Sequence, residues 1–374
     1  MLISLAWKNV WRNKKRSLIV ITAISFGLWG GLFSGAVMMG WGESMVETAI
    51  DRALSHIQIH QKQYKKEKEV RNFIPDAAKI AEQIAAVNGV KGVSARTLVY
   101  GMAASPASSY GVKITGVNPE QEKNVTKIEE YIIDGGYFEE ARRNSIVLGQ
   151  KLAKRLNLKI RSKVVLSFEG FNGDIVYIAC RVRGIFKTES ALFDEMNVFV
   201  NQNTLFKNLG TDTIFHEIAV RAESAKLVKE MNEAFKTKYT DLQVADWKET
   251  APELAFLSEM MKNFSYLFVA IIIFALLFGI TNTMLMSVVD RVREFGVLIA
   301  VGMKKRRIFL MILLETIFLS ITGGIAGTLI GGATIGIFNF NGLNLTAFAA
   351  SMESFGSSTI LYPYLPGIMY VILR

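Results

Sequence analysis

The chain has 374 residues, a formal net charge of +10 and a mean hydropathy of +0.28. That hydropathy excludes a disordered polar chain and is typical of a protein that lies partly in lipid and partly in water. The single cysteine, Cys180, excludes an internal disulfide framework and a multi-thiolate metal site.

Basic residues gather in two short segments, 8–16 and 291–307, and each segment adjoins a long uncharged run. A nucleic-acid binder would instead spread a basic stripe over a folded face. The pattern is typical of membrane topology signals, so we expect no nucleic-acid partner and contact with membrane lipid.

Three apolar runs are long enough to cross a bilayer: residues 17–42, 263–289 and 308–338, the last interrupted only by Glu315. About 20 apolar residues in a helix span the hydrocarbon core, and backbone groups in lipid must be paired within the helix. The positive-inside rule places both basic segments in the cytoplasm. Residues 43–262 are therefore predicted to fold outside the cytoplasm, and localisation is predicted to be the cytoplasmic (inner) membrane.

The predicted order along the chain is then a cytoplasmic amphipathic helix, a span, a large outer domain, a second span, a cytoplasmic loop or helix, a third span and an outer loop. Their predicted bounds are 1–16, 17–42, 43–262, 263–289, 290–307, 308–338 and 339–362.

The outer domain interleaves strand and helix signals. Period-two or β-branched runs predict strands at 54–60, 111–117, 163–168 and 174–183, and helical patterns occur at 76–87, 150–156 and 224–239. A mixed α+β domain is the expected class.

No catalytic or metal-binding arrangement is expected. His56 and His60 would lie roughly 13 Å apart on a strand, too far to share one zinc ion. We expect surface or packing histidines and a buried Cys180. The sequence contains no Gly-Lys dipeptide and hence no Walker A loop, so it does not hydrolyse ATP by that route.

Glycines recur every four residues in two of the spans. These positions share one helical face, where a missing side chain lets another backbone approach closely. Packing between spans of one chain and packing between subunits both fit the pattern. The two sets are Gly27, Gly31 and Gly35, then Gly323, Gly327 and Gly331.

Glu315 would lie roughly 12 Å along its helix from Arg307, where an ionisable group is costly and invites a functional role. No acid or histidine in the other spans offers itself as a partner, so a structural role is favoured over a proton relay.

Two amphipathic segments flank the spans. Trp7 and Trp11 lie on one face of a helix that also carries Arg12, which suits an interfacial helix. In the loop after the second span, Phe295, Leu298 and Ile299 occur at helical spacing among charged residues.

With these segments the sequence resembles the FtsX-like permeases of ABC transporters, the group of macrolide exporters and lipoprotein-releasing permeases. The matching stretches are LAWKNVWRN at 5–13, IVLGQKLAKRL at 146–156 and RVREFGVLIAVG at 291–302. The resemblance implies a membrane α-helical fold of four-span permease type, with the α+β domain between spans one and two.

The family resemblance also implies a function and partners. The chain would be a non-hydrolysing permease subunit working with a cytosolic ABC ATPase dimer, which binds ATP and Mg, and with a second permease subunit, identical or different. A periplasmic or outer-membrane partner is also implied. ATPase coupling is assigned to Arg291, Arg293, Glu294, Phe295, Gly296, Leu298, Ala300 and Gly302. Phe295 and Leu298 would enter a groove of the ATPase, and Arg291, Arg293 and Glu294 would form a polar rim.

The expected cargo is a lipoprotein or another amphiphile. Macrolide or peptide efflux, and FtsX-type activation of periplasmic enzymes, remain alternatives within the family. A membrane-bound ligand sensor is the alternative from another class. The sequence departs from the family after residue 362, because residues 363–374 provide only the start of a fourth span, which is expected to be truncated.

Overall fold

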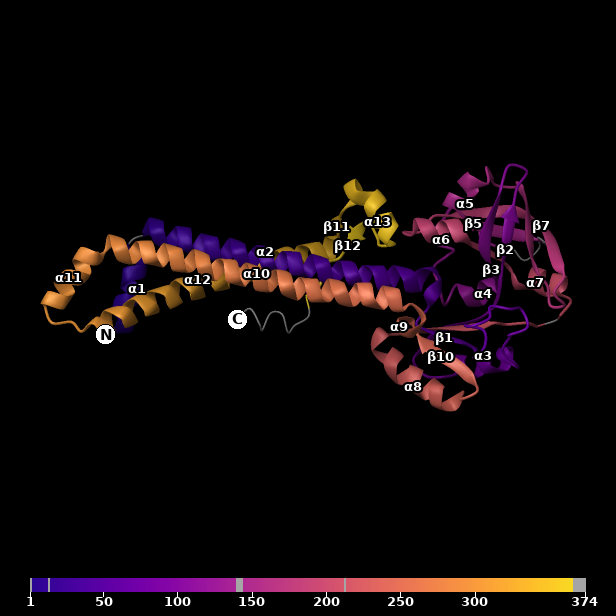
Figure 1. The fold of residues 1–374 in the computed structure, drawn as a ribbon, viewed down its shortest axis with the longest axis horizontal. Coiled ribbons are helices and arrows are strands. Elements are labelled where there is room, and N and C mark those ends of the chain that lie inside the picture. The colour runs from indigo at the N-terminus through magenta and orange to yellow at the C-terminus, as the bar shows by residue number, and fades with distance from the viewer. Residues whose placement is uncertain (1, 13, 139–143, 212, 366–374) are drawn as a thin grey trace. The chain divides into compact units, whose positions relative to one another are not determined.

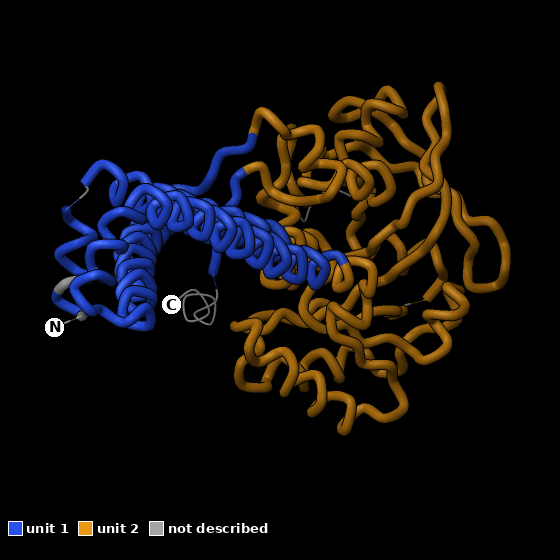
Figure 2. The backbone as a smooth tube through the Cα atoms, turned by 60° about the vertical axis from the view of Figure 1, so that its left-hand side comes forward, with its two compact units in different colours: residues 1–44, 257–345, 360–374 blue, residues 45–256, 346–359 orange. Residues whose placement is uncertain are grey.

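The fold is taken from a computed structural model, which describes residues 2–12, 14–138, 144–211 and 213–365. The chain divides into two compact units, coloured separately in Figure 2. Unit 1 contains residues 1–44, 257–345 and 360–374, and unit 2 contains residues 45–256 and 346–359.

Unit 1 is built on long helices that run side by side in Figure 1. Among the described residues, three helical stretches are long and apolar enough to cross a membrane: Lys14–Leu54, Pro252–Asp290 and Lys305–Asn341. They contain the three predicted spans and confirm them by length and composition. The predicted fourth span, 363–374, falls outside the described residues from 366 onward. The elements are α1 (Leu2–Arg12), α2 (Lys14–Ala49), α10 (Pro252–Asp290), α11 (Val292–Ala300), α12 (Lys305–Asn341), β11 (Leu343–Asn344) and β12 (Ile360–Leu361).

Both glycine sets face neighbouring spans of the same chain. A Cβ atom added to Gly27 would lie 2.5 Å from Leu276 of α10, and one added to Gly327 would lie 2.7 Å from the Ser25 carbonyl oxygen of α2. Near Gly35, the Ser265 hydroxyl of α10 donates a hydrogen bond of 3.1 Å to the glycine carbonyl. The small residues therefore hold α2 against α10 and α12, which is the packing-within-the-chain alternative.

Unit 2 contains a closed ring of strands. Strand β2 (Val90–Ala104) pairs with β3 (Ser109–Val117) and β6 (Lys163–Glu169), and β6 also pairs with β7 (Ile175–Phe186). The ring is completed through β5 (Ser145–Gly149) and β8 (Asn197–Asn201). Buried aliphatic side chains fill it, together with Cys180, which is fully buried as expected.

The N-terminal half of β2 continues into a second, open sheet. There β2 pairs with β9 (Glu217–Ala222), β9 with β1 (Ile57–Gln61), and β1 with β10 (Leu242–Asp246), all antiparallel. Helices α3 (Ala77–Ala85) and α8 (Val228–Lys238) contribute to its core and lie beside it in Figure 1. The remaining elements of unit 2 are η1 (Ile50–Leu54), α4 (Pro119–Glu122), β4 (Ile132–Gly135), α5 (Gln150–Arg155), α6 (Ala191–Met196), α7 (Gln202–Leu209), η2 (Ala225–Leu227), α9 (Trp247–Thr250), η3 (Thr346–Phe348) and α13 (Ala349–Phe355).

The outer domain is thus mixed α/β, with parallel β3–β8 and β5–β7 pairs in a largely antiparallel sheet. The predicted strand at 54–60 begins only at Ile57, because residues 50–54 form the π-helical turn η1 that ends the first long helix. The apolar–polar alternation in this stretch therefore covers both a helix end and a strand start.

A buried ionic network lies where the two sheets share β2. Arg96 contacts the carboxylate of Glu122 at 2.7 Å and that of Glu217 at 2.6 Å, and all three residues are almost fully buried. Burial alone would raise the pKa of Glu217, but Arg96 and Lys113 hold it below its usual value. This arginine is consequently fixed in place, and one of its N–H groups is left to bind a backbone carbonyl.

The three histidines are buried in unit 2 and serve packing. His60 stacks on Tyr64, and the Nδ1 atom of His216 accepts a hydrogen bond of 3.1 Å from the Leu98 amide. No group of three or more His, Cys, Asp or Glu side chains suited to a metal ion occurs among the described residues.

Candidate coupling site

Helix α11 joins α10 to α12 and folds back onto the end of unit 1. Its side chain Phe295 is buried against Ile308 and Met311 of α12. Gly302, two residues after the end of the helix, has φ +96°, a conformation that glycine adopts without strain and that turns the chain toward α12. The amphipathic pattern of the loop therefore produces a helix with one face docked on its own chain.

A line of ionic contacts fixes the start of α11. Arg291 lies at its N-terminal end and contacts Glu315 of α12 at 3.1 Å and Glu294 of α11 at 3.1 Å. Glu294 also accepts a hydrogen bond of 2.6 Å from Arg12 of α1. The first helix, α11 and the third span are thus connected through two arginines and two carboxylates, in the order Arg12, Glu294, Arg291 and Glu315.

Exposure separates these contacts into strong and weak ones. The Arg291 and Glu315 side chains are 11% and 10% exposed, whereas those of Arg12 and Glu294 are 55% and 52% exposed. Buried ion pairs are costly to break singly, and exposed pairs contribute little. Arg12 and then Arg291 lower the pKa of Glu294, so it stays ionised.

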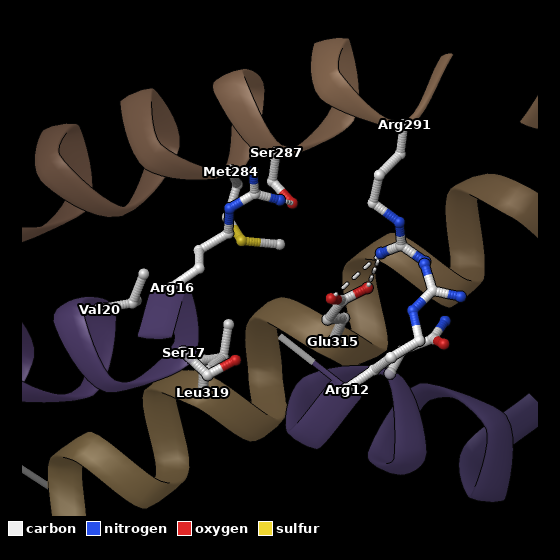
Figure 3. Close-up of a pocket in the computed structure, with 10 residues that line it drawn as sticks. Arg12, Arg16, Ser17, Val20, Met284, Ser287, Arg291, Glu315 and Leu319 are labelled. Atoms are coloured by element: carbon white, nitrogen blue, oxygen red, sulfur yellow. Dashed lines mark hydrogen bonds and ion pairs between the residues drawn. The ribbon is translucent and has the colours of Figure 1, made fainter. Parts of the chain in front are cut away.

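A small cavity of about 20 Å³ lies beside Glu315, between α1, α2, α10 and α12 (Figure 3). Figure 3 shows Arg291 directed at the Glu315 carboxylate and Arg16 directed at α10. Arg16 pairs with Asp290 and donates a hydrogen bond of 3.0 Å to the Ser287 hydroxyl. A cavity of this size holds about one water molecule.

Helix α1 packs against α12 by its tryptophans. The Trp7 ring lies edge-on to Phe318 at 5.4 Å and to Trp11 at 6.0 Å, while both indoles remain nearly half exposed. Val10, on the inner face, is fully buried. An amphipathic helix with exposed tryptophans matches the form expected of an interfacial helix.

Two details of the predicted coupling residues are wrong. Phe295 is not exposed for entry into a groove of the ATPase, since only 8% of it is accessible, and Leu298 is partly buried beside it. Arg291 is not part of an open polar rim, because it is turned inward to Glu315. Helical spacing correctly placed Phe295 and Leu298 on one face of α11, but this face packs on the chain's own α12.

The apolar residues that face outward include three that the sequence analysis did not name. Val292, Val297 and Val301 are 58%, 64% and 83% exposed, and Ile299, which it did name, is 44% exposed. Arg293, Glu294, Gly296, Ala300 and Gly302 are also exposed. The sequence contains Val297 and Val301 close to Phe295 and Leu298. Because all four residues are apolar, hydropathy alone does not show which of them face outward.

Two family models match different parts of this chain. The family model described as the MacB-like periplasmic core domain matches residues 17–238, more than half of the chain. The model described as FtsX-like permease C-terminal matches residues 266–373. The chain belongs to the FtsX-like permeases with a MacB-like periplasmic core. This permease is therefore an ABC transporter permease of the MacB/FtsX type, a membrane protein with an extracellular domain.

Relatives cover most of the permease. It is 24% identical to the uncharacterized ABC transporter permease YknZ of Bacillus subtilis, over 88% of this chain and 84% of the relative. An uncharacterized ABC transporter permease of Methanocaldococcus jannaschii is also 24% identical, over 88% and 82%. A macrolide export ATP-binding/permease protein, MacB 2 of Aeromonas hydrophila, is 36% identical over 24% of this chain and 14% of its own length.

Two solved structures are similar to about half of this chain. The periplasmic region of MacB from Actinobacillus actinomycetemcomitans is 14% identical, covers 54% of this chain and 92% of its own, and gives a TM-score of 0.38. The extracellular domain of YknZ from Gram-positive bacteria is 16% identical, with coverages of 51% and 99% and a TM-score of 0.37. Both scores lie below 0.5, and the family membership stands without them.

Proposed function

We propose that this permease is a non-hydrolysing transporter subunit, driven by a separate cytosolic ABC ATPase that docks on α11. The observation that carries the proposal is the two-sided character of α11. One side is anchored to the permease through Phe295 and Arg291, and the other leaves Val297 and Val301 exposed. Apolar side chains exposed on a short charged helix are typical of a docking surface.

The anchored side explains how docking would produce movement. Any displacement of α11 acts on α12 through the buried Arg291–Glu315 pair, and on α1 through the Arg12–Glu294 contact. Helices α2 and α10 both continue from unit 1 into unit 2. Motion delivered at α11 would therefore travel along continuous helices to the extracellular domain, with a second permease subunit completing the transporter.

The proposed cargo is an amphiphile, in the first place a lipoprotein. The observation favouring macrolide or peptide efflux instead is that several of the relatives are named macrolide export proteins. Deletion strains separate the two: lipoprotein release predicts lipoproteins retained in the cytoplasmic membrane, and efflux predicts macrolide sensitivity with lipoproteins correctly located.

Co-purification tests the docking proposal. Detergent-extracted permease should bring down an ABC ATPase, and Val297→Asp should reduce the recovered ATPase at least about tenfold, since a carboxylate in an apolar contact is costly to desolvate. The matched control is Ile175→Asp in the outer domain, because Ile175 and Val297 are each 64% exposed. Recovery of the same amount of ATPase with wild type and Val297→Asp would refute docking on α11.

A further inference from the structure

The first span ends inside unit 2 in an unusual way. After α2, residues Ile50–Leu54 form a single π-helical turn, and the next residue, Ser55, has φ +56° although it is not glycine. Single π turns occur frequently at functional sites, and a non-glycine residue at positive φ stores strain that its surroundings must hold. The chain then enters β1 directly. A helix joined to a strand by this turn would swivel unless side chains fixed it.

Asp51, in the π turn, is held by two cations from different parts of unit 2. Its Oδ2 atom lies 2.8 Å from Lys127 Nζ, and its Oδ1 atom lies 2.7 Å from Arg221 Nη1, an ion pair without hydrogen-bond geometry. The Lys127 amide also donates a hydrogen bond of 2.7 Å to the Asp51 carbonyl. Asp51 is 5% exposed, so these charges interact with little screening by water.

Two more donors bind the carbonyls that end the turn. Arg96, fixed by the buried network described above, donates a hydrogen bond of 2.7 Å to the Ala53 carbonyl. Gln58 of β1 donates one of 2.9 Å to the Leu54 carbonyl. Helix-terminal carbonyls lack partners within the helix. Side chains from β1, β2, β9 and the segment after α4 therefore converge on the turn η1. We call the following set the Asp51 clamp: Asp51, Gln58, Arg96, Lys127 and Arg221.

We propose that Asp51 is a positioning residue for energy transmission, because the clamp prevents the turn at Ser55 from swivelling. Displacement of α2 is then passed to both sheets of the outer domain as a rigid movement. Without the clamp the helix end would rotate at the strained turn, and the outer domain would stay behind. This inference rests on the proposed function, since it assumes that movement starts at the far end of the span.

A purely structural role is the competing explanation. A buried ion pair also affects folding, and removing one partner leaves uncompensated charge. The two explanations differ in what the complex does after it has assembled. A structural defect lowers the amount of folded permease and its thermal stability, whereas loss of transmission leaves ATP hydrolysis intact and removes the movement that it drives.

The test measures that movement in the full permease–ATPase complex in lipid nanodiscs. Spin labels are attached to cysteines placed at Tyr177 in the outer domain and Phe274 in the second span, which are 67% and 63% exposed, in a Cys180→Ala background. The label-to-label distance is compared without nucleotide and after trapping with ATP and vanadate. We expect the distance to shift in wild type and to shift less than half as much in Asp51→Ala. The Asp51→Ala complex should hydrolyse ATP at a rate within about twofold of the wild-type rate.

Two further variants separate the explanations. Asp51→Glu keeps the charge and should restore most of the shift. Lys123→Met removes an exposed cation that contacts Glu120 and Glu129 near Lys127, and it should leave the shift unchanged. If Asp51→Ala fails to fold, Lys127→Met removes one side of the clamp and should reduce the shift.

Each outcome decides one question. A full shift in Asp51→Ala, or in Lys127→Met where Asp51→Ala does not fold, overturns the clamp proposal. An assembled wild-type complex that hydrolyses ATP without any shift overturns the proposed function, on which the clamp's role depends. A reduced shift in Asp51→Ala with hydrolysis maintained and recovery in Asp51→Glu supports transmission through Asp51.

Discussion

At the scale of single residues, the sequence indicated that an ionised Glu315 is energetically costly within a span. It did not predict that Arg291 would be its partner. The two are 24 positions apart on different helices, and whether they meet depends on how α10 and α12 rotate about their axes. The structure resolves the expectation of a structural role for Glu315 in a specific way: it is the buried anion that holds the start of α11.

The Arg291–Glu315 pair should behave as a coupled unit. Glu315→Leu leaves Arg291 with only the exposed Glu294, and we expect it to lower the free energy of unfolding by about 3 kcal/mol. Adding Arg291→Leu should recover part of that loss, since no charge then remains buried. Arg12→Leu, which breaks an exposed pair, should cost much less, since solvent screens the charges of exposed pairs. Thermal unfolding in detergent measures these variants and the Arg291→Leu single mutant, and additive effects of Glu315→Leu and Arg291→Leu would contradict the pairing.

His216 gives the outer domain a predictable pH dependence. Burial lowers its pKa to about 4, against the smaller effect of a hydrogen bond to the Val70 carbonyl. The unfolded chain, with an ordinary histidine pKa near 6.5, binds the proton more readily. Stability should therefore be full above about pH 6.5 and fall toward pH 4, by about 3 kcal/mol from this residue.

The control for this prediction is His216→Asn, which keeps an acceptor for the Leu98 amide and does not titrate. The variant should be less stable than wild type at pH 7.5, and the difference should narrow as the pH falls. Burial raises the pKa of Asp194 to about 6, so the contribution of Asp194 to stability increases as the pH falls through the same window. Wild type and His216→Asn must therefore be compared with each other at each pH. A constant difference in melting temperature from pH 7.5 to 4.5 would show that His216 does not titrate as expected.

At the scale of elements, long apolar runs and glycine spacing predicted the spans and their contact faces well. These features are local, and lipid imposes helix on any run that is long enough. The choice of neighbour was not local. Gly27 faces α10 and Gly327 faces α2, and nothing in a four-residue spacing says which helix will occupy the face.

The orientation of α11 was beyond the sequence for a similar reason. Its apolar residues occur on more than one side, and only the return of α12 decides that Phe295 is inside and Val297 outside. The Asp51 clamp was also not predictable, because its members come from η1, β1, β2, β9 and the segment after α4, which only the folded domain brings together. Local patterns therefore predicted elements, and tertiary packing decided the candidate sites.

Glycine substitutions test the helix packing directly. Gly327→Ala places a methyl group 2.7 Å from the Ser25 carbonyl oxygen, so α2 and α12 must separate, and we expect a loss of about 1–3 kcal/mol in unfolding free energy. Gly332→Ala is the matched control on the same helix, since nothing lies within 4 Å of its added atom. Equal melting temperatures for the two variants would mean that α2 and α12 do not pack through Gly327.

At the scale of the whole molecule, the charge distribution predicted the layout of three spans and a large outer domain before any contact was known. Four of the strands and the class of the domain were also recognisable, but the closed ring of strands was not. Ring closure requires β6 to pair with both β2 and β7, and these pairings are set by long-range register that no local pattern encodes.

The central claim is that energy enters this permease at α11 from a protein that the chain does not contain. Cysteine accessibility at Val301, 83% exposed after α11, tests it most directly. In cell membranes, Val301→Cys should react with a membrane-permeant maleimide when the permease is made alone, and should be protected when the co-purifying ATPase is present. Tyr177→Cys in the outer domain should react equally with the maleimide whether or not the ATPase is present. Equal labelling of Val301→Cys with and without the ATPase, or its labelling by an impermeant reagent from outside the cell, would contradict the account.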